Sequence, residues 1–393
     1  MSKSRSTLAS RRSVLKGAAA AGVAFAMPAI ITHSTKAVAA DDNTVRIIGS
    51  VTMPPESWDV FEAQTGLKAE FTPFNVDDIG ALYNEIVVNG GVERYDIISV
   101  LGGMQKGFVA EGIIAPIDTS KLKNFAGIPT SVSRNPLIYL DDKDWGVPTI
   151  MNADSFGYFP GQLNLAPPPE LMNWDLLLNS EATLGKSSME ADQIALMIGG
   201  MYLKSRDLAS IGDPGNMTPD ECKTVADWLI ERKKAGQFRN FWKNYDEQIA
   251  NFVNGEVVVQ RCWEPVVKDA RRQGLDVYYA YCSDFHVNWM HAAFVSEPTA
   301  NSDRMEQVYK ALDWLTGGAY AADHAARTGY TCSRMDLGLE YAEAEGWTAE
   351  QIDDIKANME KVEFKLKNPN FWIPGMPDEA KAYNEQAERF RNA

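Results

Sequence analysis

The segment that decides the fold is Tyr95-Asp96-Ile97-Ile98-Ser99-Val100. A short apolar run of this kind, with Gly102-Gly103 close behind it, is typical of a buried strand that ends in a loop. Upstream of it, the residue pattern predicts strand, helix, strand and helix over residues 44–51, 56–65, 67–74 and 77–89. Such alternation with short links predicts a parallel sheet wrapped by helices, which is an α/β fold.

Two loops are candidates for ligand binding because of their position. Ligands of open α/β sheets bind beyond the carboxyl ends of the strands. The loops Ser50–Met53 and Leu101–Met104 follow the first and third predicted strands. Thr52 and Gly102 are therefore candidate binding residues.

The rest of the chain predicts a second α/β unit and a mainly helical end. Two extended runs, at 145–150 and 155–159, are separated by Met151-Asn152-Ala153-Asp154. Further helices are expected at 192–204, 218–234, 246–253, 264–273, 303–315, 318–327, 348–361 and 377–391, and further extended runs at 256–263, 276–281 and 289–295. Two α/β lobes accommodate this order of elements.

The charge balance argues against nucleic acid as a partner. The 393 residues include 38 Lys and Arg against 53 Asp and Glu, a net charge of −15. Phosphate binding needs clustered cationic surface, which this composition does not offer.

The first 39 residues predict an export signal. Arg11-Arg12 precede an apolar run rich in Ala and Gly, and the order resembles a twin-arginine signal. That run, about fifteen residues long, is too short to cross a bilayer comfortably. Ala37-Val38-Ala39 has the small-x-small pattern of a cleavage site, so we expect cleavage near Ala39/Ala40. A retained membrane anchor is the alternative.

The four cysteines show no metal or redox motif. Cys222, Cys262, Cys282 and Cys332 are far apart, with no CxxC pair. Because Cys262 and Cys282 end two predicted strands, they are the pair we expect to form a disulfide, with buried free thiols as the alternative.

Catalytic and cofactor motifs are missing or incomplete. Residues 180–187 lack the first glycine of a P-loop, and no GxGxxG, HExxH or GxSxG motif occurs. Cys282, Asp284, His286 and His291 match no familiar metal spacing. We therefore expect no enzymatic activity, cofactor or metal.

Several segments, in their order along the chain, resemble the extracellular solute-binding proteins of ABC importers, in the group that contains the spermidine/putrescine-binding proteins. These segments are Tyr95–Val100, Glu111–Asp118, Lys121–Asn124, Trp145–Pro148, Ser155–Tyr158, Asn254–Val257, Cys262–Glu264, Trp289–Ala293 and Thr328–Thr331. The resemblance implies a two-lobed type II periplasmic binding protein fold with crossover hinge strands, closing over a solute. The implied lobes are 40–150 with about 289–345, and 151–288 with about 346–393.

The resemblance also implies a pocket in which aromatic rings enclose alkyl and ammonium groups and carboxylates pair the nitrogens. The positions that match the family's pocket are Asp154, either Glu190 or Asp192 at a helix entry, Trp263, Glu264 and Trp289; His291 stands where the family has another residue, and the loop residues Thr52 and Gly102 would line the opposite lobe.

The implied role is capture of a small polar, amine-containing and polyamine-like solute in the periplasm by a monomer, for delivery to an ABC permease. The family commonly has Asp where this chain has His291, and Trp or Tyr in the loop at Val51–Met53. A smaller amine, a zwitterion or an organic acid paired with His291 is therefore an alternative. An exported enzyme and a sensor subunit are two others.

Overall fold

The computed structural model describes residues 43–74, 79–367 and 370–393. The predicted export signal and its cleavage site lie outside the described residues. Within the described ranges, no helix has both the length and the apolar character that a membrane span requires.

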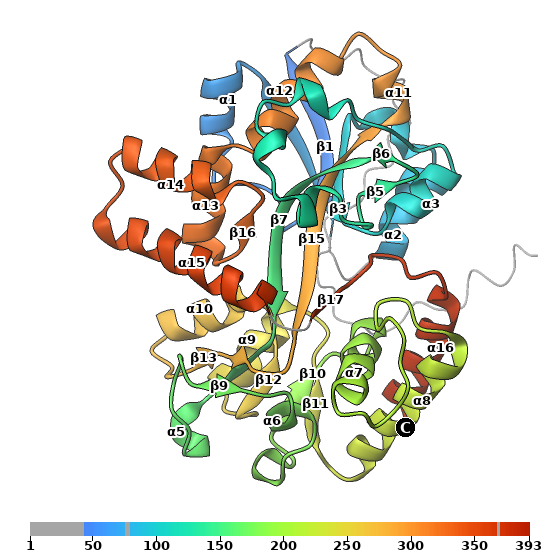
Figure 1. Cartoon of the computed structure of the whole chain (residues 1–393), viewed down its shortest axis with the longest axis vertical. Helices are drawn as coiled ribbons and strands as arrows, with labels where there is room; N and C mark the ends of the chain where they lie inside the picture. Colours follow the sequence, from blue (N-terminus) through green and yellow to red (C-terminus); the bar gives the residue numbers. More distant parts are fainter. Residues whose placement is uncertain (1–42, 75–78, 368–369) are drawn as a thin grey trace, which may run out of the picture. The chain divides into compact units, whose positions relative to one another are not determined.

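The described residues form a larger sheet of eight strands and a smaller sheet of five (Figure 1). The larger sheet has the order β16-β7-β15-β3-β1-β2, and β4 and β17 also pair with β15. Its strands are β1 Thr44–Ser50, β2 Lys68–Phe74, β3 Ile97–Leu101, β4 Ile114–Ala115, β7 Gly146–Asp154, β15 His286–Ser296, β16 Thr331–Cys332 and β17 Asn370–Trp372.

The predicted parallel start of the fold is present in the larger sheet. β1 pairs in parallel with β2 and with β3, with Ile47 opposite both Phe71 and Ile97. β3 then pairs antiparallel with β15. The carboxyl ends of β1 and β3 therefore lie next to each other, which places the two candidate loops on one edge.

The smaller sheet has the order β11-β10-β12-β8-β13. Its strands are β8 Phe156–Tyr158, β10 Ser187–Met189, β11 Phe238–Phe241, β12 Val259–Arg261 and β13 Tyr278–Tyr279; short pairs elsewhere are β5 Tyr139–Leu140 with β6 Lys143–Asp144, and β9 Leu171–Met172 with β14 Tyr281–Cys282.

The two sheets are joined where β7 passes into β8 with only Ser155 between them. The expected break at residues 151–154 is wrong, because β7 continues through them as a fully buried strand paired with β15. The polar residues that suggested a loop have internal partners: Asn152 Nδ2 donates to Asp154 Oδ1 at 3.1 Å. Ser155 is fixed at the crossing, since its N–H donates to the Tyr279 hydroxyl and its hydroxyl to the Ala280 carbonyl.

Most helices lie close to their predicted positions. The α-helices are α1 Asp59–Thr65, α2 Ile79–Tyr83, α3 Gln105–Ala110, α4 Thr130–Ser133, α5 Pro160–Leu163, α6 Asp175–Leu178, α7 Gln193–Ser205, α8 Pro219–Lys234, α9 Tyr245–Val253, α10 Glu264–Arg272, α11 Glu297–Ala300, α12 Met305–Leu315, α13 Gly318–Thr328, α14 Met335–Ala344, α15 Ala349–Lys367 and α16 Ala380–Asn392. A π-helix at Asn84–Val88 follows α2, and 3-10 turns lie at Gly91–Arg94, Thr119–Lys121, Phe125–Gly127 and Glu181–Thr183.

Local sequence explains where the helices near the smaller sheet begin. Asp192 caps α7 by accepting from the N–H groups of Ile194 and Ala195, and Asn244 caps α9. Thr218 and Glu221 form a capping box at the start of α8. Such caps satisfy amide groups that have no partner within the helix.

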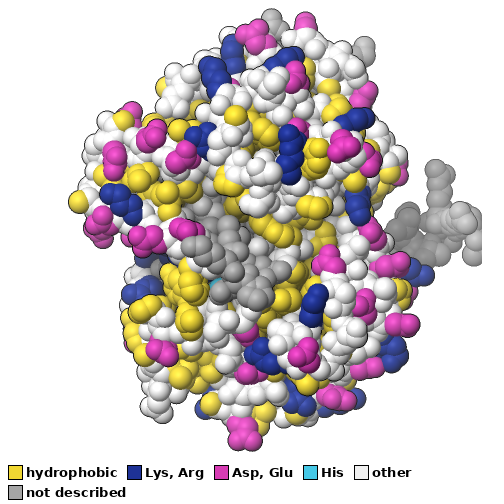
Figure 2. Space-filling model, in the orientation of Figure 1, with side chains coloured by type: hydrophobic (Ala, Val, Ile, Leu, Met, Phe, Trp, Pro, Cys, Tyr) yellow, Lys and Arg dark blue, Asp and Glu magenta, His cyan; other side chains and the backbone are white. Residues whose placement is uncertain are grey.

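The helices are distributed over the two sheets. α12 contacts β1, α13 contacts β16, and α7 and α8 pack with α16 near the smaller sheet (Figure 1). On the face drawn in Figure 2, hydrophobic side chains gather around the middle, whereas Asp and Glu lie mainly over the outer parts.

The predicted disulfide between Cys262 and Cys282 is wrong. All four cysteines are buried thiols. Cys262 follows β12, but β8 lies between β12 and β13, and Cys282 belongs to β14, which pairs with β9. The two strand ends are therefore not neighbours in a sheet.

Candidate functional site

A cavity of about 490 Å³ is lined by residues from the elements of both sheets. From the larger sheet and its helices come Val51, Thr52, Phe74, Val100, Leu101, Met104, Trp289, His291, Arg327, Thr328, Tyr330 and Ile373. From the smaller sheet and its helices come Gln193, Ile194, Asn244, Tyr245, Asp246, Arg261, Trp263 and Pro265. The volume suits a small organic solute.

Four of the candidate residues lie in this lining: Thr52, Trp263, Trp289 and His291. Thr52 holds its loop in place, because its hydroxyl is 2.9 Å from the Ser50 hydroxyl and its carbonyl is 3.2 Å from His324 Nε2. Both predicted loops contribute to the cavity, since Leu101 and Met104 line it together with Thr52.

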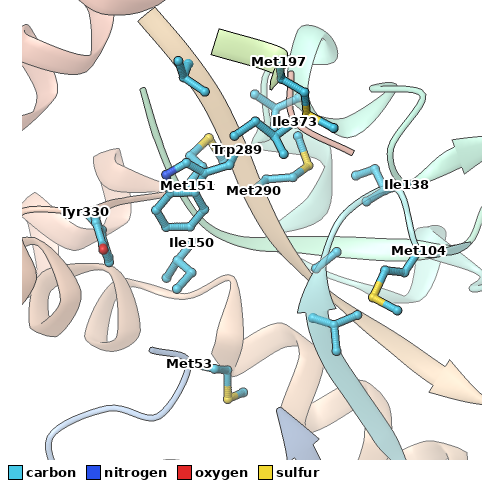
Figure 3. Close-up of a cluster of buried hydrophobic side chains, with 14 of the residues drawn as sticks. Met53, Met104, Ile138, Ile150, Met151, Met197, Trp289, Met290, Tyr330 and Ile373 are labelled. Atoms are coloured by element: carbon cyan, nitrogen blue, oxygen red, sulfur yellow. The ribbon is translucent and has the colours of Figure 1, made fainter. Parts of the chain in front are cut away.

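Aromatic rings form two groups in the wall. Trp289 on β15 packs edge-on against Tyr330 at 4.9 Å between ring centroids (Figure 3). Trp263, at the start of α10, stacks on Tyr245 at 6.3 Å with an interplanar angle of 13°. Because β15 belongs to the larger sheet and α10 follows β12 of the smaller one, each sheet contributes one aromatic pair.

His291 is a neutral side chain in this site. Burial, with the nearby His324, lowers the pKa of His291 to about 3. Among the described residues, its Nδ1 has no hydrogen-bond partner. A neutral His291 can donate or accept a hydrogen bond. It carries no positive charge, so it cannot form an ion pair with an organic acid.

Gly102 is not among the lining residues and has a packing role. Its N–H donates to the Met290 carbonyl. A Cβ at this position would approach the Leu137 and Met290 side chains at 3.0 and 3.1 Å. The absence of a side chain therefore lets β3 end close against β15.

Asp154, Glu190 and Asp192 gather around a residue that the sequence reasoning missed, Arg261 on β12. Arg261 is 1% exposed, and its Nη2 donates to Asp154 Oδ2 at 3.2 Å. Its Nε lies 3.2 Å from Glu190 Oε1, within ion-pair distance but without hydrogen-bond geometry. The signal that could have revealed it is a single charged residue inside the apolar run Val257–Trp263.

Burial controls the charges around Arg261. It raises the pKa of Glu190 to about 8, although the Arg261 charge opposes this shift. It raises the pKa of Asp154 as well, against the same opposing charge. Asp192 is used as the cap of α7, while its pKa is also raised by burial.

Glu264 is paired with lysines. Its carboxylate contacts Lys361, lies 3.6 Å from Lys365 Nζ, and accepts from Asn152 Nδ2 at 3.2 Å. Although burial opposes it, the charges of Lys361 and Lys365 lower the pKa of Glu264 to about 2. The carboxylate that was expected to pair a solute nitrogen thus has internal partners on α15.

We expect Glu190→Gln to abolish a fall in stability with rising pH. The folded-state pKa of about 8 lies above the ordinary value of 4.5. The folded protein therefore keeps a proton that the unfolded chain loses, so the free energy of unfolding falls as the pH rises from about 4.5 to about 8. The loss amounts to at most about 5 kcal/mol. Urea unfolding of both proteins across this window would test it, and parallel pH profiles would contradict it.

Sequence comparison identifies the family. Residues 57–351 match the model of the bacterial extracellular solute-binding proteins. The spermidine/putrescine-binding periplasmic protein 1 of Haemophilus influenzae is 21% identical over 307 residues, which cover 77% of this chain and 79% of that protein. The corresponding protein of Escherichia coli is 23% identical over 294 residues, covering 74% and 78%.

Structural comparison confirms the predicted two-lobed α/β fold. The spermidine/putrescine ABC transporter substrate-binding protein of Streptococcus pneumoniae superposes with a TM-score of 0.67 at 14% identity. The match covers 89% of this chain and 99% of that one. With the family match over three quarters of its length and a solute-sized cavity between its two sheets, the chain belongs to the bacterial extracellular solute-binding proteins.

Proposed function

We propose that this protein captures a small amine-containing solute in the periplasm and delivers it to an ABC permease in the cytoplasmic membrane. The observation that carries the proposal is the cavity, into which each sheet contributes an aromatic pair. A solute that touches both pairs links the two lobes, which is how a binding protein signals that it is loaded.

The chemistry of the cavity lining supports an amine group on the solute. The faces of Trp, Tyr and Phe rings attract ammonium groups, most strongly where water is excluded. Asp246, an exposed residue in the first turn of α9, adds a carboxylate to the same lining as Trp263 and Tyr245. The relatives from Haemophilus influenzae and Escherichia coli are named for spermidine and putrescine, which supports an amine in the solute.

A thermal-shift screen tests this function. We expect at least one compound among polyamines, diamines, amino acids, betaines and organic acids to raise the unfolding temperature. A ligand present at about 100 times its Kd stabilises the folded state by about 2.7 kcal/mol. Calorimetric titration of each hit would then give its affinity. A flat response to every class would overturn the proposal.

The export route is part of the proposal. Arg11-Arg12 and the apolar run behind them support twin-arginine export with cleavage near Ala39/Ala40. Replacing both arginines with lysine is expected to leave the uncleaved precursor in the cytoplasm, as measured by fractionation and immunoblotting. A variant that still reaches the periplasm in mature form would contradict this route.

We also propose that the protein acts as a monomer, without a cofactor and without catalysis. The family match supports a binding role, because its members are solute-binding proteins. Light scattering would measure the mass in solution, and an optical spectrum of the purified protein would reveal a flavin, haem or iron–sulfur group.

A further inference from the structure

We infer that the solute carries a carboxylate and that Arg261 binds it. This inference rests on the proposed function, because it names the substrate class of the same cavity. The solute would then be zwitterionic, with an ammonium group at one end and a carboxylate at the other.

The first support is an unused donor group on a buried side chain. Arg261 lines the cavity and is 1% exposed. Its guanidinium has five N–H donors, of which Nη2 serves Asp154 and Nε faces Glu190. Among the described residues, Nη1 has no hydrogen-bond partner. A buried donor without a partner is unfavourable. Less than 1 Å² of Nη1 is accessible in the free protein, so a carboxylate in the cavity would satisfy it once the side chain turns toward the cavity.

The second support is the direction of the surrounding helices. Lining residues come from the first turns of α7, α9 and α10, namely Gln193, Ile194, Tyr245, Asp246 and Pro265. The N-terminal end of a helix carries a partial positive charge and favours an anion. Asp192 already supplies an anion at α7 and Asp246 one at α9, whereas the start of α10 has no side-chain cap. These ends lie on the same side of the cavity as Arg261, since all three helices belong with the smaller sheet.

The third support is the balance of charge behind Arg261. Because burial raises the pKa of Glu190 to about 8, this carboxyl group is mostly protonated at neutral pH. Asp154 then forms the ion pair with Arg261, while Asp192, whose charge also acts on Arg261, caps α7. Protonation of Glu190 therefore reduces the negative charge that an arriving carboxylate meets beside Arg261.

A second arginine in the lining is already engaged. Arg327 Nη2 donates to the Pro54 carbonyl at 2.9 Å and to Asp323 Oδ2 at 3.2 Å. The two arginines also argue against a dication, because a second ammonium group would lie in a wall that contains two guanidinium groups and one carboxylate, that of Asp246. A solute with one ammonium group near Asp246 and one carboxylate at Arg261 would be complementary in charge to the lining at both ends.

The test compares ligands that differ only in the acidic group. Putrescine and 4-aminobutanoate share an amine and a carbon chain, as do cadaverine and 5-aminopentanoate. Calorimetry on the mature protein would measure these pairs, spermidine, α-amino acids, betaines and dicarboxylates. We expect the tightest ligand to carry a carboxylate, and its amide to bind about ten- to a hundredfold more weakly, as loss of a charge-assisted hydrogen bond predicts. This comparison uses the unmodified protein.

Variants then locate the carboxylate. Arg261→Gln is expected to lower affinity for the acid about ten- to a hundredfold while leaving affinity for its amide nearly unchanged. This change removes the ion-pair partner of Asp154. The double variant Asp154→Asn, Arg261→Gln is therefore measured in parallel, because it leaves no unpaired carboxylate at residue 154. Arg304→Gln is the matched control, because Arg304 is a largely buried arginine outside the cavity lining and its partner Asp96 keeps Arg46.

The possible outcomes separate the inference from the function. If diamines or spermidine bind best, or the amide binds as tightly as the acid, the inference fails and the proposed function stands. If the acid binds best but Arg261→Gln distinguishes acid from amide as well as the unmodified protein does, the carboxylate lies elsewhere and the inference fails. Binding by no compound overturns both.

Discussion

Replacing Glu264 with glutamine is expected to lower the free energy of unfolding by about 3–5 kcal/mol. The Glu264 carboxylate compensates Lys361 and Lys365, and the Lys365 side chain is fully buried. The neutral amide would remove the negative charge that Glu264 supplies to these ammonium groups inside the protein, which is costly. Urea unfolding at neutral pH measures the loss.

The pH dependence of this effect has a definite sign. The folded-state pKa of Glu264, about 2, lies below its ordinary value of 4.5. Its contribution to stability is therefore fully present above about pH 4.5 and is lost as the pH falls toward about 2. The difference between the two proteins should shrink over that interval.

A matched control uses the same substitution on the surface. Glu256 pairs with Arg239 at 2.8 Å, but both side chains are largely exposed. Glu256→Gln is expected to cost less than about 1 kcal/mol. If Glu264→Gln proved equally mild but weakened amine binding, the original prediction of a ligand role for Glu264 would be favoured over the internal ion cluster.

Replacing Trp289 with alanine is expected to lower both stability and solute affinity. Trp289 is 7% exposed and packs against Tyr330 and His291. Removal of a buried tryptophan costs about 3–5 kcal/mol. Loss of an aromatic face from the cavity should weaken an amine-containing solute at least about tenfold. Unfolding curves and calorimetry measure the two effects.

Two further variants separate these effects. Trp289→Phe keeps an aromatic ring and should recover most of the affinity. Trp347 packs on Tyr341 outside the lining contributed by the described residues, so Trp347→Ala should leave affinity unchanged. Equal affinity of Trp289→Ala and the unmodified protein would show that Trp289 is a core residue only.

Periodicity and capping residues were sufficient to predict the fold class and most helices. Thr218, Asn244 and Asp192 act as helix caps within two residues of the expected starts. The continuation of β7 through residues 151–154 could not be predicted in the same way. Asn152 and Asp154 interrupt the apolar pattern, but they are buried in contact with distant residues: Asn152 Nδ2 donates to Glu264, and Asp154 accepts from Arg261.

The same limit applies to the candidate site. The resemblance pointed to Trp263 and Trp289, which line the cavity. It could not show that Glu264 faces lysines of α15, because that pairing joins residues about a hundred positions apart. Arg261 was missed because its neighbours in sequence predict only a short buried strand. Its place in the site depends on contacts with Asp154 and Glu190, which lie far from it in the sequence.

The buried thiols have a consequence for where this protein can fold. Burial raises the pKa of Cys222, Cys262, Cys282 and Cys332, so all four remain protonated inside the core. Because the four cysteines are thiols, folding requires no disulfide formation and no oxidant, and it can be completed in a reducing compartment. The described residues can thus reach their native packing before the protein leaves the cytoplasm, which the proposed twin-arginine route requires.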